Sequence, residues 1–207
     1  MKRCLMLCVA FLACWVSSAA ASTADIWNAA TAHLSSASQI TVDVRLDDGE
    51  RIRVQQNTAS GQVIRRYLNG QLLRTSVALW DLPSKPGNAQ PLTGYWELRS
   101  NATCWTRFQF SSAYRPFSDA FYRLQNAFER NMGWPPALSS KEIKVKLKGA
   151  SRLLAVQRKL NQSTVKASVV VDRARGFMRR YEEPGEIVTF TYPKAKPVLA
   201  PAAQCAT

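Results

Sequence analysis

The residue types that carry out chemistry do not form a catalytic pattern in this 207-residue chain. The single histidine, His33, has no second histidine, cysteine pair or acid at ligand spacing beside it, which disfavours a general base or a metal ligand. The sequence contains no Gly-x-Ser-x-Gly, no His-Glu-x-x-His and no glycine-rich phosphate-binding loop. Aspartates and glutamates are scattered, and no spaced pair points to carboxylate catalysis. We therefore predict a protein that is not an enzyme and that needs no metal or cofactor.

The chain begins with a segment typical of a secretory signal peptide. Lys2 and Arg3 precede an apolar run over residues 4–16, and three alanines at 19–21 suit a cleavage site. This run of about 13 residues is short of the roughly 20 that cross a bilayer. We therefore expect residues 1–21 to be removed and the mature protein to be secreted or periplasmic.

Two cysteines are left after that cleavage, because the other three of the five lie within residues 1–21. A pair in an exported chain predicts one disulfide, here between Cys104 and Cys205, with two free thiols as the alternative. The bridge would close a loop of roughly 100 residues, for which the chain-entropy model gives at most about 4.7 kcal/mol. It would hold the proline- and alanine-rich C-terminal tail, residues 193–207, to the rest of the protein.

The chain is strongly basic, with a formal net charge of +14 that falls by two, to +12, when Lys2 and Arg3 are removed. An exported location disfavours nucleic acid as a partner and favours an anionic membrane surface or an envelope partner protein. Positive residues that alternate with apolar ones are also typical of the solvated face of a sheet. The charge alone therefore leaves a binding surface and a solvated face as two open interpretations.

Alternation of apolar and polar residues predicts most of the elements that would position a site. In the stretch Lys-Glu-Ile-Lys-Val-Lys-Leu-Lys, the apolar Ile143, Val145 and Leu147 alternate with lysines, which predicts a half-buried strand. Asn69 and Gly70 are the strongest hairpin signal, because both accept the positive φ of a type I′ turn. Similar patterns occur in eleven stretches and predict a sheet of about ten strands. The stretches are residues 39–46, 51–55, 62–68, 71–80, 95–98, 104–110, 141–148, 152–160, 163–171, 177–182 and 186–192.

Two helices are predicted, one before and one after the first block of strands. Residues 22–37 can be capped by Ser22 or Thr23 and carry Trp27 as an apolar anchor. Residues 116–133 carry an apolar stripe at helical spacing that must be buried, formed by Phe117, Phe121, Leu124, Phe128 and Met132. The predicted fold class is α+β: one domain over residues 22–192 with a large curved antiparallel sheet, an unclosed barrel, and the second helix on its concave face.

This layout can be compared with known families. An opening helix runs into a long meander at residues 27–46, the helix at 117–132 separates two blocks of strands, and a late strand at 186–193 precedes Lys196-Pro197-Val198. In this order of elements the chain resembles the extracytoplasmic lipid and lipoprotein carriers typified by LolA, LppX and LprG. The resemblance covers most of the mature chain. It implies an unclosed barrel whose apolar interior, partly filled by helices, receives acyl chains.

The expected function is therefore to bind or carry a lipid-like, acylated ligand, in a monomeric protein. The predicted ligand-binding residues are Trp27, Val44, Trp96, Phe108, Phe110, Phe117, Phe121, Leu124, Phe128, Val145 and Leu147. The alternative is a fully packed interior in a basic binding module that docks on anionic envelope polymers or on a partner protein. The two hypotheses differ in whether a cavity lies between the helix at 117–132 and the sheet.

Overall fold

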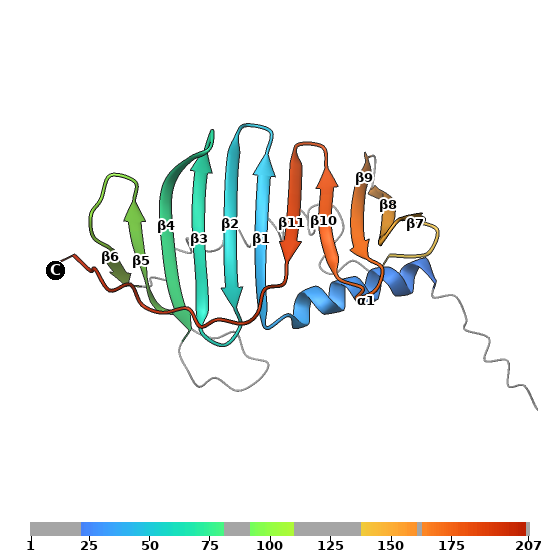
Figure 1. Ribbon diagram of the computed structural model, residues 1–207. Helices are drawn as coiled ribbons and strands as arrows, with labels where there is room; N and C mark the ends of the chain where they lie inside the picture. Colours follow the sequence, from blue (N-terminus) through green and yellow to red (C-terminus); the bar gives the residue numbers. More distant parts are fainter. Residues whose placement is uncertain (1–21, 81–91, 110–137, 161–162, 206–207) are drawn as a thin grey trace, which may run out of the picture.

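The computed structural model describes residues 22–80, 92–109, 138–160 and 163–205. These residues form a single antiparallel sheet and one helix, so the fold is α+β, as predicted. Among the described residues the sheet has eleven strands in the order β6-β5-β4-β3-β2-β1-β11-β10-β9-β8-β7, and it is unclosed, with β6 and β7 at the two ends of this order (Figure 1). The predicted signal peptide and the predicted helix at 116–133 lie outside the described residues.

The predicted strands are confirmed, with shifts of a few residues at their ends. They are β1 (Gln39–Leu46), β2 (Glu50–Asn57), β3 (Gly61–Leu68), β4 (Gln71–Trp80), β5 (Leu92–Arg99), β6 (Thr106–Gln109), β7 (Ile143–Lys148), β8 (Ser151–Leu160), β9 (Ser163–Asp172), β10 (Met178–Glu183) and β11 (Glu186–Thr191). The hairpin between β3 and β4 turns at Asn69 and Gly70, whose φ values of 49° and 83° suit the predicted type I′ turn.

One long-range strand pair joins the two halves of the chain. β1–β6 form one meander and β7–β11 another, and β1 pairs with β11 so that Val42 lies opposite Phe190 and Val44 opposite Val188. These four side chains are buried on the same side of the sheet. The pairing therefore makes one continuous apolar face out of two meanders.

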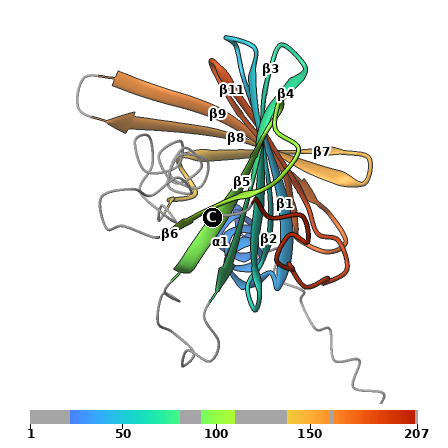
Figure 2. The same ribbon diagram turned by 90° about the vertical axis from the view of Figure 1, so that its left-hand side faces the viewer.

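We call this side the apolar face, and most of the buried core lies on it. Its members include Ile40, Val42, Val44, Ile52, Val54, Ile64, Ala78, Tyr95, Leu154, Val156, Val169, Tyr181, Val188 and Phe190. The strands twist strongly along the sheet, as right-handed strands do, so that β7–β9 run across the direction of β1–β4 in Figure 2. The opposite face carries most of the sheet's lysines and arginines, as alternation requires.

Helix α1 (Thr23–Ser36) begins with a capping box. The Asp25 backbone N–H donates to Ser22 Oγ (3.1 Å), and the Ser22 backbone N–H donates to Asp25 Oδ2 (2.9 Å). Trp27, Ala30 and Leu34 are buried in the core, and the helix contacts chiefly β7 and β10. Figure 1 shows α1 lying along one end of the strands from β11 to β7. Within the part of the chain that is described, no helix has the length and apolarity to span a membrane.

The C-terminal tail runs past the ends of β1–β4 towards the β6 edge (Figure 1). Side chains at those strand ends bind its backbone. The Lys196 N–H donates to Gln39 Oε1 (3.2 Å), Asn57 Nδ2 donates to the Lys196 carbonyl (3.0 Å), and the Val198 N–H donates to Ser60 Oγ (2.8 Å). The tail is therefore fixed along much of its length, although it contains no helix or strand.

The predicted disulfide is confirmed between Cys104 and Cys205, whose Cα atoms are 5.1 Å apart. Beside it, the Trp105 N–H donates to the Ala203 carbonyl (2.8 Å), and the Cys205 N–H donates to the Trp105 carbonyl (2.9 Å). The bridge thus ties the tail to the chain just before β6. It is consistent with an oxidising, extracytoplasmic location.

Candidate ligand-binding site at the open edge of the sheet

The predicted ligand residues do not share one location: some lie in the core, some lie away from it, and some are outside the described residues. Trp27 and Val44 are fully buried in the core, and Phe108 and Val145 pack against it. Leu147 and Trp96 do not belong to this core. Outside the described residues are Phe110, Phe117, Phe121, Leu124 and Phe128.

Leu147 does not face a core, in contrast to the prediction. The strand is half-buried only at its start: Ile143 is 3% exposed, whereas Leu147 is 64% exposed. Its partner across the hairpin is the charged Arg152, and β7 lies at one end of the described strand order. The apolar alternation therefore continues beyond the point at which the core ends.

Trp96 lies on the opposite side of β5 from the apolar face. In the β5–β6 register Trp96 pairs with Arg107, whereas the neighbouring Tyr95 pairs with Phe108. Because side chains alternate across a strand, Trp96 and Phe108 point to opposite faces and cannot line one cavity. Trp96 is instead covered in part by Arg107, whose guanidinium carbon lies 5.5 Å from the ring centroid.

A small hollow opens on the apolar-face side of β5 and β6, and we call it the edge hollow. It has a volume of about 250 Å³ and is lined by Glu97, Arg99, Ala102, Thr106 and Phe108. The register places Glu97 opposite Thr106. The ring of Phe108 stacks on that of Tyr95 with centroids 5.0 Å apart, which gives the hollow an aromatic wall.

The polar side of the edge hollow is a buried carboxylate between two guanidiniums. The Glu97 side chain is only 5% exposed, and its oxygens lie 3.3 Å from Arg74 Nη1 and 3.1 Å from Arg99 Nε. A buried carboxylate is costly unless it is paired, and Arg74 and Arg99 supply that pairing. Arg99 is also 72% exposed, so much of its guanidinium faces solvent at the mouth of the hollow.

Three arginines lie side by side on adjacent strands, and two of them, Arg74 and Arg99, pair with Glu97. Arg66 lies directly opposite Arg74, and Arg74 directly opposite Arg99, in the registers of β3, β4 and β5. Like charges directly opposite one another destabilise a sheet, and Glu97 offsets part of this repulsion. The arrangement concentrates positive charge along one end of the apolar face.

The edge hollow places an aromatic wall beside a guanidinium. An aromatic wall suits an apolar chain, and a guanidinium suits a carboxylate or phosphate through paired N–H donors. Of the residues that line the hollow, Phe108 was among the predicted ligand residues, whereas Glu97, Arg99, Ala102 and Thr106 were not. The signal was present, because alternation along β5 places Tyr95, Glu97 and Arg99 on one side.

Two tyrosines elsewhere in the described chain have pKa values well above the ordinary value. Burial, together with the nearby Glu183, raises the pKa of Tyr181 far above its ordinary value, and its hydroxyl donates to Glu183 Oε2 (2.9 Å). Burial raises the pKa of Tyr192 to about 12. His33 is exposed, and its ring meets the edge of Phe177 with centroids 5.0 Å apart. Among the described residues, no group of three or more His, Cys, Asp or Glu side chains could hold a metal ion.

Comparison of the chain with protein-family models and with curated protein sequences returned no match.

Proposed function

We propose that this is an exported, non-enzymatic protein that binds a lipid-like, acylated ligand with an acidic head. The observation that carries the proposal is the edge hollow, where Phe108, stacked on Tyr95, lies beside the exposed guanidinium of Arg99. The aromatic wall suits the apolar chain of an acidic amphiphile, and the guanidinium at the mouth of the hollow suits its acidic head.

The energetics favour such a ligand. Each methylene removed from water contributes roughly 0.8 kcal/mol, so a few methylenes against the aromatic wall give measurable affinity. A charge-assisted hydrogen bond from Arg99 to the acidic head adds roughly 1.5–3 kcal/mol, less where solvent competes. At about 250 Å³ the edge hollow is slightly smaller than the roughly 300–1,000 Å³ typical of ligand pockets. It therefore accommodates the head and the first part of a chain, with the remainder extending past the open β6 edge.

Two further features support the proposal. The confirmed disulfide is consistent with an extracytoplasmic location, which agrees with the expected signal peptide at residues 1–21. The unclosed sheet with a single apolar face agrees with the layout of the lipid and lipoprotein carriers. On this proposal the protein acts as a monomer and presents the β6 edge as the entrance.

The test is a titration of the mature protein with a fluorescent fatty acid, using two matched arginine variants. Arg99→Gln removes the cation at the edge hollow. Arg45→Gln removes a comparable arginine on the opposite face, 62% exposed and 3.5 Å from Asp43. We expect about tenfold weaker binding for Arg99→Gln, from the loss of one charged hydrogen bond, and unchanged binding for Arg45→Gln.

A third variant tests the apolar part of the site. Phe108→Ala removes the aromatic wall and should also weaken binding, whereas the matched Phe177→Ala, which alters the contacts with His33 and Tyr192, should not. No measurable binding to the wild-type protein would overturn the proposal. Equal losses for Arg99→Gln and Arg45→Gln would place the ligand elsewhere and overturn the assignment to the edge hollow.

A further inference from the structure

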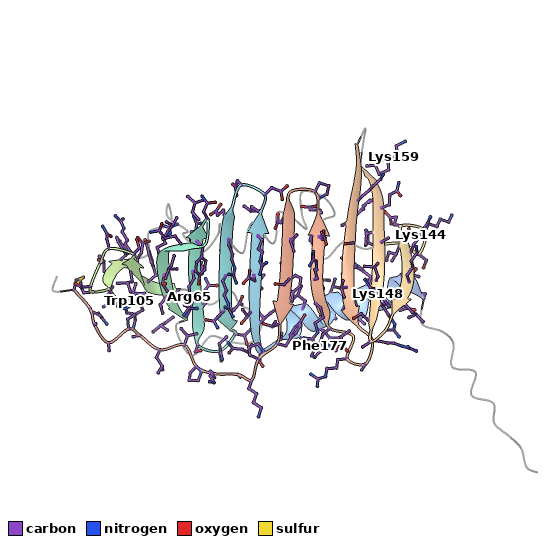
Figure 3. The ribbon with its side chains drawn as sticks, turned by 45° about the horizontal axis from the view of Figure 1, so that its top comes forward. Arg65, Trp105, Lys144, Lys148, Lys159 and Phe177 are labelled. Atoms are coloured by element: carbon purple, nitrogen blue, oxygen red, sulfur yellow. A yellow bond between two sulfur atoms is a disulfide. The ribbon has the colours of Figure 1, made fainter. Side chains whose placement is uncertain are left out.

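The face of β7–β9 opposite the core carries a dense set of lysines. Lys144, Lys146 and Lys148 alternate along β7, and Lys159 and Lys166 extend the set onto β8 and β9. The registers pair Lys144 with Ala155 and Lys166 with Gln157, so the lysines of β7 and β9 flank the central strand on one side of the sheet. All five are exposed. We call this surface the lysine face, and Figure 3 shows Lys144 and Lys159 projecting from this end of the sheet.

The lysine face is hollowed rather than flat. A depression of about 570 Å³ lies at the start of β7, the second half of β8 and the first half of β9. Among the described residues it is lined by Lys141, Lys144, Lys159, Lys166, Glu142, Ala155, Val156, Gln157, Thr164 and Ala167. The small side chain of Ala155, on the central strand, leaves room between the lysines on either side. Four lysines thus line one depression.

The acid at the rim of this depression is already engaged. Glu142 Oε2 accepts hydrogen bonds from the backbone N–H and the hydroxyl of Ser139, both at 2.8 Å. Its other oxygen, Oε1, lies 3.4 Å from Arg158 Nε. These hydrogen bonds lower the pKa of Glu142, so it stays ionised and bound to these partners. Within the described residues, none of the lysines of this face forms an ion pair.

We propose that the lysine face docks on an anionic phospholipid surface, with phosphate headgroups entering the depression. Groups of four to eight basic residues are typical of surfaces that bind anionic lipid, because each cation contributes to the attraction. The proposal goes beyond the ligand assigned to the edge hollow, since β6 and β7 are the opposite edges of the sheet.

The arrangement favours a leaflet over a nucleic acid. The lysines are spread in two dimensions over three strands, which suits an array of single phosphates. Binding of single-stranded nucleic acid relies on aromatic side chains on which bases stack, and the described residues of this face include none. The cations are lysines, which act as flexible point charges rather than as planar forks for one fixed partner.

The experiment is flotation of the mature protein with vesicles of phosphatidylglycerol and phosphatidylcholine, compared with vesicles of phosphatidylcholine alone. Lys144→Gln with Lys166→Gln removes two charges across the depression. Lys194→Gln with Lys196→Gln removes two exposed charges from the tail as a matched control. We expect partitioning onto anionic vesicles to fall about 30-fold for the first pair, about fivefold per lysine, and to change little for the second. Binding should also be lost on neutral vesicles and in high salt.

Three outcomes would overturn the proposal. They are an equal loss for the two pairs, which would indicate net charge alone; no binding of the wild-type protein to anionic vesicles; and tight binding of soluble heparin without vesicle binding. Arg99→Gln separates the two proposals. It should bind vesicles like the wild type while its fatty-acid binding weakens. A wild-type protein that binds anionic vesicles but no fatty acid would remove the ligand proposal while supporting this one.

Discussion

The disulfide between Cys104 and Cys205 provides a quantitative test of how the tail is held. The two cysteines are 101 residues apart, and for a loop of about this length the chain-entropy model gives about 4.7 kcal/mol of stabilisation. Replacing both with serine removes that constraint from the unfolded chain. The tail keeps its hydrogen bonds to Gln39, Asn57 and Ser60, so the native state itself changes little. We therefore expect the free energy of unfolding to fall by about 3–4.7 kcal/mol.

Urea denaturation followed by circular dichroism measures this change. The midpoint should fall while the native spectrum stays the same, and the chemically reduced wild-type protein should behave like the double variant. Because the crosslink restricts the unfolded state, its removal also exposes more surface on unfolding, so the slope of the transition should increase. An unchanged midpoint would refute the reasoning, and an altered native spectrum would show that the bridge shapes the folded state instead.

Three other substitutions test local features of the fold. Trp27→Ala should cost about 3–5 kcal/mol in urea unfolding, because a fully buried indole anchors α1, and a loss below about 1 kcal/mol would contradict that role. Ser22→Ala should cost about 1 kcal/mol and Ser22→Asp much less, because aspartate also caps; equal losses would argue against capping. Asp172→Asn tests pH dependence, since hydrogen bonds from the Arg175 backbone N–H and from Arg179 lower the pKa of Asp172 below 3.8. A carboxylate with a lowered pKa stabilises the fold above its unfolded-state pKa and loses that contribution as the pH falls through its folded-state pKa. The variant should therefore be less stable than the wild type at pH 7 and equal to it in acid. A difference in stability that does not depend on pH would contradict this.

The local structure of this protein follows closely from its sequence. Alternation located the strands, Ser22 and Trp27 located α1, and Asn69 with Gly70 located a tight turn. Each of these depends on residues near one another in the chain. The disulfide could also be predicted, because removal of the expected signal peptide left only Cys104 and Cys205 to pair.

Contacts between residues that are distant in the chain were harder to predict from the sequence. The pairing of β1 with β11 could not be predicted, since several strands carry the same alternation and any two could pair. Leu147 illustrates the same limit, because alternation shows which side of a strand a residue faces but not where the core ends. The arginines at 66, 74 and 99 come together only through the register of three strands. The hydrogen bonds that hold the tail likewise depend on where the strand ends meet it.

Native mass spectrometry of the purified mature protein tests the proposed binding of an acylated ligand at the β6 edge. The wild-type protein should carry an adduct with the mass of a fatty acid or another acidic lipid. The adduct should be depleted in Phe108→Ala and in Arg99→Gln but retained in Arg45→Gln. Protein that is consistently empty, even after incubation with fatty acids, would contradict the proposal.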